Sequence, residues 1–298
     1  MTDYIPPDPS VAEWVYQQRA AEKERARRLQ STSPQQLKHL VRDRNEPTIL
    51  RASAMSKLAF SSCDRPLVPF SCRGDPEVPD ILLGLLSEPE PEMRRLALQF
   101  AHFCWSDPRV VEKVRSLLDD TDLYVYAEAA MVLARKRDKA VLPYLLTWFH
   151  GGDEPHRNMA TACLRFMKTP EAHRALRESW EQGGRSEWDR VGLASALLWS
   201  GDSCGVPFLE EVARRADGVW SGVAATALYG TSAYHAEGLK LMRWVLDHGT
   251  LEAKQWMVGQ IYNLARPLLE HAFTADGIHE ARCWIDQHLQ ETATRRPG

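Results

Sequence analysis

The residues best suited to chemistry in this sequence are the dipeptide Trp188-Asp189 and, further along the chain, Trp220. A carboxylate and the faces of aromatic rings both stabilise a developing positive charge. Such a set could assist a reaction that passes through a cationic sugar. A nucleic-acid substrate would also require a basic groove, whereas the charged residues that we place on the same surface have both signs. These are Glu92, Glu128 and Asp189 against Arg94, Arg95, Arg157 and Arg190.

The sequence predicts neither a metal site nor a cofactor. Its ten histidines include no H-E-x-x-H motif, and His279-Glu280 is the one His-Glu pair. Cys63 and Cys72 have no histidine between them, and their separation is longer than that of the cysteine pairs in zinc sites. No phosphate-binding loop and no G-x-S-x-G motif occur, so we predict no catalytic residue.

The elements that would position these residues are helices that recur along the chain. The stretch 122–134, DLYVYAEAAMVLA, resembles two earlier stretches, 48–59 and 91–101. It also resembles later stretches at 155–165, 188–198, 219–229 and, more weakly, 252–262. Each has a large apolar anchor residue with small or apolar residues three and four positions before it. The anchors are Leu58, Phe100, Leu133, Leu164, Leu197, Leu228 and Ile261.

The spacing of the anchors indicates a helical repeat array. Successive anchors are 42, 33, 31, 33, 31 and 33 residues apart. A second helix fits between each pair of anchors, and a repeat of two helices at this period is typical of a solenoid. We expect positions −3, −4 and −7 from each anchor to face the core, and positions −5 and −8 to point sideways or outward.

The paired helices, the A-x-x-L-A core at 130–134 and the Pro or Asp at the turns resemble HEAT repeats, in particular the short bacterial kind of the phycobilisome-lyase proteins. The resemblance covers about 34–266. It implies an all-α fold: an α-solenoid, wound as a right-handed superhelix of about seven helical hairpins with a capping helix at each end. It also implies that the second helix of each pair lines the concave surface.

Composition gives bounds that agree with this fold. The 298-residue chain is 44% hydrophobic and 26% charged, with a formal net charge of −3. This charge gives no global attraction to nucleic acid or membrane, and no apolar run is long enough for a transmembrane span. The first residues lack the pattern of a signal peptide, and the six cysteines are scattered. We therefore expect a cytoplasmic protein.

Three segments depart from the repeat. Residues 1–33 predict an extended arm and a capping helix that begins after Ser10, and residues 267–298 predict a second capping helix, from about 276 to 290, with a disordered tail. Residues 34–266 form the repeat array between them. The long spacing between the first two anchors predicts a proline-rich loop at 61–79, and such insertions often lie on the binding face of a repeat protein.

Aromatic and charged side chains on the second helices are the candidate binding residues. Aromatic residues and Arg near a groove commonly anchor a protein partner. The candidates are Arg94, Arg95, Tyr124, Glu128, His156, Asn158, Trp188, Asp189, Trp220, Gln255 and Trp256.

Non-enzymatic protein binding, through the concave surface, the 61–79 loop or both, is the function that we favour from the sequence. In a bacterial protein this would be an adaptor or an immunity protein that neutralises a toxin. We expect a monomer or weak homodimer, with no nucleic-acid partner and no membrane contact. The alternatives are enzymes: the chain resembles the HEAT-like alkylpurine DNA glycosylases in its Trp188-Asp189 and Trp220 set, and bilin lyases in its repeats. It lacks the several His-Glu pairs of the HEAT-like iron hydroxylases.

Overall fold

The computed structural model describes residues 24, 27–29, 32–61, 77–183, 186–264 and 275–294, and within these ranges all regular elements are helices. The first helices of successive pairs are α2 (Pro34–Arg42), α4 (Glu77–Leu85), α6 (Pro108–Ser116), α8 (Leu142–Gly151), α10 (Pro170–Gln182), α12 (Val206–Arg215) and α14 (His235–His248). The second helices are α3 (Thr48–Ser61), α5 (Pro91–Ala101), α7 (Leu123–Arg135), α9 (Glu154–Met167), α11 (Glu187–Ser200), α13 (Val219–Tyr229) and α15 (Leu251–Leu264). A last helix, α16 (Ala275–Thr294), follows, and short 3-10 turns occupy η1 (His102–Cys104), η2 (Leu117–Asp119), η3 (Lys139–Val141), η4 (Ser203–Gly205) and η5 (Ser232–Tyr234).

Local sequence explains where the helices begin. The Ser33 hydroxyl accepts a hydrogen bond from the Gln36 backbone N–H, and the Gln36 side chain accepts one from the Ser33 N–H, which completes a capping box. The Asp122 carboxylate caps α7, and the Thr169 hydroxyl caps α10. Proline occupies the first turn of α2, α5, α6, α9, α10 and α12, where its missing N–H costs no hydrogen bond.

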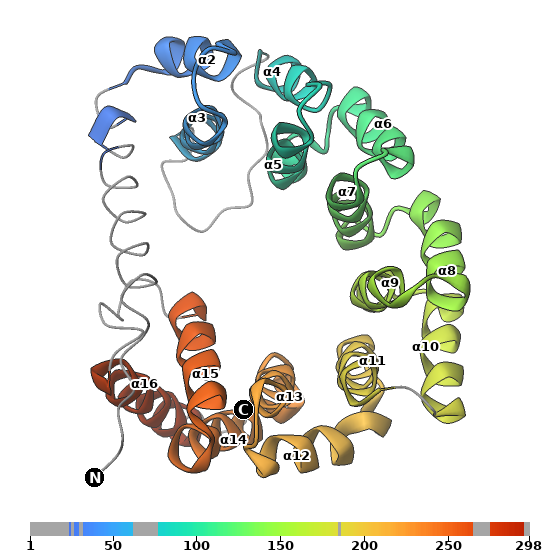
Figure 1. The fold of residues 1–298 in the computed structure, drawn as a ribbon, viewed down its shortest axis with the longest axis vertical. Coiled ribbons are helices and arrows are strands. Elements are labelled where there is room, and N and C mark those ends of the chain that lie inside the picture. The colour runs from blue at the N-terminus through green and yellow to red at the C-terminus, as the bar shows by residue number, and fades with distance from the viewer. Residues whose placement is uncertain are drawn as a thin grey trace. The chain divides into compact units, whose positions relative to one another are not determined.

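The structure divides into two compact units at position 148, inside α8. In the unit before this position, α3, α5 and α7 contact one another in series, while α2, α4 and α6 form the other layer. In the unit from 148 onward, α9, α11, α13 and α15 pack side by side, with α10, α12 and α14 behind them (Figure 1). The two-layer packing confirms the predicted α-solenoid of helical hairpins, seven of them among the described residues.

The predicted register is confirmed at the core positions. Position −3 is buried in all seven repeats, and so is every anchor except Phe100, which is half-buried. The small residues at −3, such as Ala130 and Ala194, let neighbouring helices approach closely. In the unit from 148 onward, these residues join one apolar cluster that runs from α11 to α16.

Two other register positions differ from the expectation. Position −7, which the register assigns to the core, is buried in three repeats, at Arg51, Met93 and Ser221. In the other four it is half-buried, and the long side chains of Arg157 and Arg190 there reach the surface. Position −8 was expected outside, but Val125, Asp189 and Ala253 are buried there. Both positions lie in the first turns of the second helices. There, contact with the preceding hairpin determines which face of the helix is buried.

Ion pairs connect helices to the turns of the next hairpin. The Arg94 guanidinium binds both carboxylate oxygens of Asp120 at 2.8 Å, and neither side chain is more than 12% exposed. The equivalent pairs are Arg115 with Asp138 and Arg177 with Asp202, both at 2.7 Å. Burial opposes ionisation of Asp120, but hydrogen bonds from Arg94 and the Asp122 backbone prevail and lower its pKa.

The two ends and the long insertion are described in part. Glu24 and residues 27–29 of the expected N-terminal capping helix are helical, and the rest of 1–33 lies almost entirely outside the described residues. Ser61 ends α3 and α4 begins at Glu77, so the predicted 61–79 loop is too long at both ends; residues 62–76 are outside the described part of the chain.

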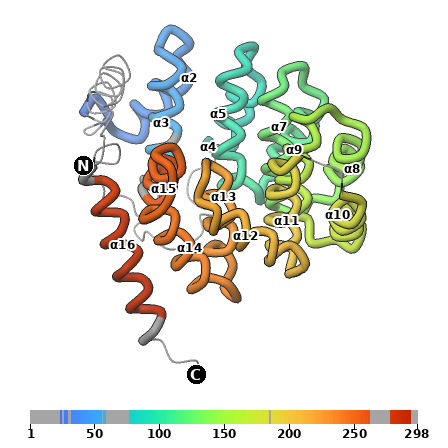
Figure 2. The backbone as a smooth tube through the Cα atoms, turned by 60° about the horizontal axis from the view of Figure 1, so that its bottom comes forward, coloured from blue at the N-terminus to red at the C-terminus, as the bar shows by residue number. Residues whose placement is uncertain are grey.

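The C-terminal capping helix is present and longer than predicted. The α16 helix packs on α14 and α15 at the end of its unit (Figure 2). Ala281, Trp284 and Ile285 form its buried stripe. Residues 291–294, which we expected in a disordered tail, are its last turn. None of the described helices is long and apolar enough to cross a membrane.

Candidate binding site

The main surface feature of the unit from 148 onward is a groove across α9, α11, α13 and α15, which we call the tryptophan groove. It has a volume of about 840 Å³. Side chains from all four helices line it. Its lining includes Trp188, Trp199, Trp220 and Trp256, which we call its walls, and the small residues Ala162, Gly192, Ala196 and Ala227, which we call its floor.

Two of the groove tryptophans contact each other, and the four differ in their exposure to solvent. Trp188 and Trp220 meet edge to face, with ring centroids 3.7 Å apart and planes 89° apart. Trp188 and Trp199 are 41% and 40% exposed, while Trp220 and Trp256 are partly buried against the core. A solvent-exposed indole with its base held by packing offers a large apolar contact at small entropic cost.

The hydroxyl groups in the groove are turned toward the backbone. The hydroxyls of Thr161, Ser195 and Thr226 each donate to the carbonyl oxygen four residues earlier in the same helix, at 2.7–2.9 Å. Their single O–H donors are therefore used within the helices, and the threonine methyl groups contribute apolar surface. The floor of the groove is more apolar than its residue types suggest.

The groove lining has two charged residues, the positive Arg165 and the negative Glu252. Arg165 lies at the end of α9, with its guanidinium carbon 4.6 Å from the Phe166 ring centroid and 5.3 Å from that of Trp199. Glu252 is exposed in the first turn of α15. The lining thus presents apolar surface with one positive group and one negative group, rather than a field of one sign.

Four of the predicted binding residues lie in this groove. They are Asn158, Trp188, Trp220 and Trp256. Gln255, the neighbour of Trp256, is exposed on α15 but does not line the groove. His156 is half-buried at the start of α9, where its Nδ1 lies 2.5 Å from the Asp153 carboxylate. The hydrogen bonds from His156 lower the pKa of Asp153.

Apart from Asp189, which lies in the unit from 148 onward, the remaining predicted residues lie in the unit before position 148. Arg94 is held by its ion pair with Asp120 and also donates to two backbone carbonyls, which makes it part of the repeat packing. Arg95 pairs with Glu92 at 2.8 Å and keeps partial exposure. Tyr124 is 68% exposed and Glu128 is half-buried. Of this set, Tyr124 offers the most surface to a partner.

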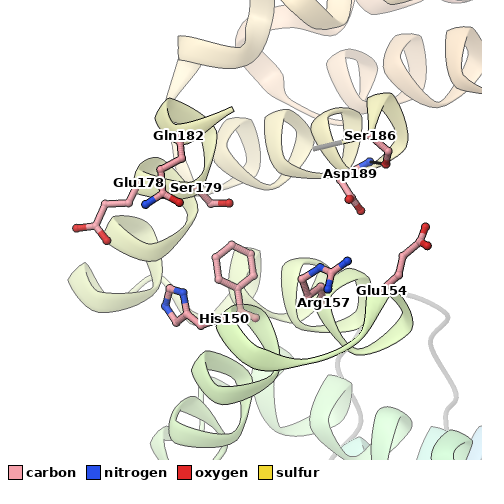
Figure 3. A pocket seen from close by; sticks show the side chains of 9 residues that line it. His150, Glu154, Arg157, Glu178, Ser179, Gln182, Ser186 and Asp189 are labelled. Carbon is pink, nitrogen blue, oxygen red and sulfur yellow. Dashed lines mark hydrogen bonds between the residues drawn. The ribbon is translucent and has the colours of Figure 1, made fainter. Parts of the chain in front are cut away.

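The structure separates the carboxylate of the predicted cation-stabilising set from its tryptophans. Trp188 faces the tryptophan groove, whereas Asp189 is 8% exposed and lines another pocket, with Arg157 and Ser186 (Figure 3). The three side chains of the predicted set therefore do not share one cavity. Among the described residues, no group of three or more His, Cys, Asp or Glu side chains could hold a metal ion.

Sequence reasoning missed Trp199 and Arg165. On α11, Trp188, Gly192, Ser195 and Trp199 form one stripe, because residues three or four apart lie on the same face of a helix. Trp199 lies two positions after the anchor Leu197, and Arg165 lies one position after the anchor Leu164. Extending the register past the anchors would have found both residues.

Comparisons with known proteins agree with this geometry. Residues 111–197 match a family model described as HEAT repeats. The chain is an α-solenoid of HEAT-like hairpins, since the same plan extends over the described repeats on both sides of this match. No curated protein matches the sequence.

Among solved structures, the chain is similar to one from the complex of CpcE and CpcF of phycocyanin lyase from Nostoc sp. PCC7120. The TM-score is 0.53 with 14% sequence identity, over 87% of this chain and 94% of the other. This likeness shows the fold. An engineered protein matches 85% of this chain and 71% of its own with 17% identity, at a TM-score of 0.34.

Proposed function

We propose that this chain is a non-enzymatic protein-binding scaffold, whose tryptophan groove binds an apolar segment of a protein partner. The observation that carries the proposal is the presence of two tryptophans, each about 40% exposed, at the two ends of one helix face. Leaving large apolar rings in water has a free-energy cost that a bound partner removes.

The lining favours a protein segment over a nucleic acid. Binding to a phosphate backbone depends on several Lys or Arg contacts. The groove has only two charged lining residues, Arg165 and Glu252, and they differ in sign. An apolar segment with an acidic residue near Arg165 and a basic residue near Glu252 would complement both. Because the groove floor is made of packed helices, little ordering entropy is lost on binding.

The structural neighbour supports a scaffold role in general terms. It comes from a complex of two proteins, and the likeness carries the fold without carrying an activity. Two finer roles fit the groove equally: an adaptor that holds a partner in an assembly, and an immunity protein that neutralises a toxin. An effect of this chain on the activity of the isolated partner would distinguish the second role from the first. Residues 62–76 remain a candidate for a second contact.

Filling the groove tests the proposal directly. Gly192 lies on the groove floor, and a Cβ there would meet only the Thr161 methyl group, at 4.0 Å. Gly192→Trp should therefore block the groove while α11 stays folded, and Gly192→Ala is the matched control that leaves the groove open. Circular dichroism melting should show that both variants are folded.

The ligand for this test is a random peptide library displayed on phage and selected on the wild-type chain. We expect enriched peptides with aliphatic or aromatic residues, whose binding to Gly192→Trp is weaker by about tenfold or more than binding to Gly192→Ala, measured by fluorescence anisotropy. Absence of enrichment, or equal binding to both variants, would contradict the proposal. The same pair of variants then identifies the natural partner, as the protein captured from lysate by Gly192→Ala and not by Gly192→Trp.

A further inference from the structure

A second pocket, of about 460 Å³, lies in the same unit beside the start of α9 and of α11. We call it the acidic pocket. Side chains from the end of α8 and from α9, α10 and α11 surround it, as Figure 3 shows. The lining residues used below are Glu154, Arg157, Glu178, Ser179, Gln182 and Asp189.

The Asp189 carboxylate lacks a hydrogen-bond donor. Asp189 is 8% exposed, and its Oδ1 is buried without a hydrogen-bond partner. Helix capping accounts for the backbone of this residue, because its N–H donates to the Ser186 hydroxyl at 3.2 Å. Capping does not account for the side chain. A buried carboxylate oxygen without a donor destabilises the folded chain, and a bound donor would remove that cost.

The charges around the pocket favour a cation. Glu154 and Glu178 are exposed carboxylates on its rim, and Asp189 is the buried one. Arg157 is the one arginine of the lining, which has no lysine, and its Nη1 donates to the Gly152 carbonyl oxygen at 2.7 Å. The lining therefore has three carboxylates and one arginine that already has a backbone partner, with Glu178 at the far side of the pocket from Arg157 and Asp189 (Figure 3).

The oxygen acceptors of the pocket are spread over several helices, and this arrangement favours one kind of cation over others. The described residues form no cluster that could hold a metal ion. The oxygen acceptors come from three helices: Glu154 on α9, Ser179 and Gln182 on α10, and Asp189 on α11. A planar guanidinium group has five N–H donors that point in several directions, which suits acceptors on several sides better than a point-like ammonium does.

We propose that the acidic pocket binds a guanidinium group, with the Asp189 carboxylate as its central acceptor. The group could belong to a free small molecule or to an arginine side chain of a protein. The two cavities share no lining residue, although Trp188 of the groove precedes Asp189 and Asn158 of the groove follows Arg157 in the sequence. The experiment therefore includes a probe for each source.

The test titrates the full chain with two guanidinium probes, agmatine and N-acetyl-arginine amide, by isothermal calorimetry or by tryptophan fluorescence. Urea, a neutral planar molecule, is the control ligand. We expect wild type to bind at least one probe and not urea, and Asp189→Asn to weaken binding by about tenfold or more. Glu178→Gln should weaken it less, and Glu171→Gln, which changes an exposed carboxylate of α10 that does not line the pocket, should bind as wild type does.

The two probes distinguish the two sources. Tighter binding of agmatine indicates a free ligand, and tighter binding of the arginine amide indicates a protein side chain. Glu178→Gln keeps the test decisive if Asp189→Asn does not fold, since Glu178 is exposed. The proposal is overturned if wild type binds neither probe, or if Asp189→Asn, folded as judged by circular dichroism, binds as wild type does.

Discussion

Trp188 and Trp220 are each the second residue of their helix, and their indole rings meet edge to face with planes 89° apart. This contact joins the starts of α11 and α13 at one wall of the tryptophan groove. Because the two rings contact each other within the chain, without a ligand, the wall is formed before any partner binds. The exposed part of Trp188 is then free to contact a ligand.

Truncating the two exposed tryptophans of the groove should weaken binding without unfolding the chain. For Trp188→Ala with Trp199→Ala we expect a loss of about 2 kcal/mol or more in the binding free energy of a groove-selected peptide. The matched control is Trp244→Ala on α14, since Trp244 is 43% exposed and does not line the groove. Fluorescence anisotropy measures the affinities, and equal losses in the control and the double variant would show that binding does not use the groove.

The same substitution should have opposite effects at two glycines of the unit. Gly192→Ala adds a Cβ whose one neighbour, the Thr161 methyl group at 4.0 Å, is at ordinary contact distance, so it should stabilise the chain by about 0.5–1 kcal/mol through helix propensity. Gly222→Ala adds a Cβ against the Trp256 ring, which must move, so it should destabilise the chain by about 1–3 kcal/mol. Urea denaturation midpoints measure both. A stabilised Gly222→Ala would mean that Trp256 is not held against α13.

The core could be predicted from the sequence because its pattern is repeated. Burial of Ala130 and Ala194, three positions before their anchors, follows from helical periodicity alone and recurs in all seven repeats. The seven hairpins follow from the same pattern, whereas the capping helix α16 is predicted from an apolar stripe outside the repeat. One half-buried anchor, Phe100, is the exception.

The site could be predicted only in part, because its surface depends on contacts between hairpins. Trp188 and Asp189 are neighbours in sequence, yet one faces the groove and the other is buried beside the preceding hairpin. Helical periodicity separates them by about 100°, but it does not say which of the two directions a neighbouring helix covers. Arg94 shows the same limit, since its partner Asp120 belongs to the next repeat.

Truncating two anchors should show the difference between full and partial burial. Leu133 is fully buried in α7, so Leu133→Ala should cost about 2–5 kcal/mol in the free energy of unfolding, from lost transfer energy and the remaining cavity. Phe100→Ala removes a larger side chain from a half-buried position, so its cost should fall below the range of about 3–5 kcal/mol typical of a buried Phe. Urea denaturation of the two variants compares them. If Phe100→Ala proved the more damaging, the α5–α7 contact would depend on Phe100 as a full core residue.

The ion pair of Arg177 with Asp202 should make stability depend on pH in acid. Burial tends to raise the pKa of Asp202, but hydrogen bonds from the Cys204 backbone N–H and from Arg177 outweigh it and lower the pKa from 3.8 to about 2. His173 also faces this carboxylate, with its Nε2 at 3.2 Å. Since the folded chain binds this proton more weakly than the unfolded chain, the pair stabilises the fold above pH 4, and this contribution disappears as the pH falls from about 4 to about 2.

Asp202→Asn isolates this contribution, because an Asn side chain can still accept from the Cys204 N–H while the charge is removed. At pH 6 we expect the variant to be less stable than wild type by about 1–2 kcal/mol, and this difference should shrink toward zero between pH 4 and pH 2. Urea denaturation at fixed pH values measures both proteins, and Glu171→Gln serves as the control because Glu171 is an exposed carboxylate of the same helix as Arg177. If the difference in unfolding free energy between wild type and Asp202→Asn stayed constant down to pH 2, Asp202 would stabilise the fold through its hydrogen bonds alone. Its charge would then contribute nothing to the contact between the two hairpins that Arg177 and Asp202 connect.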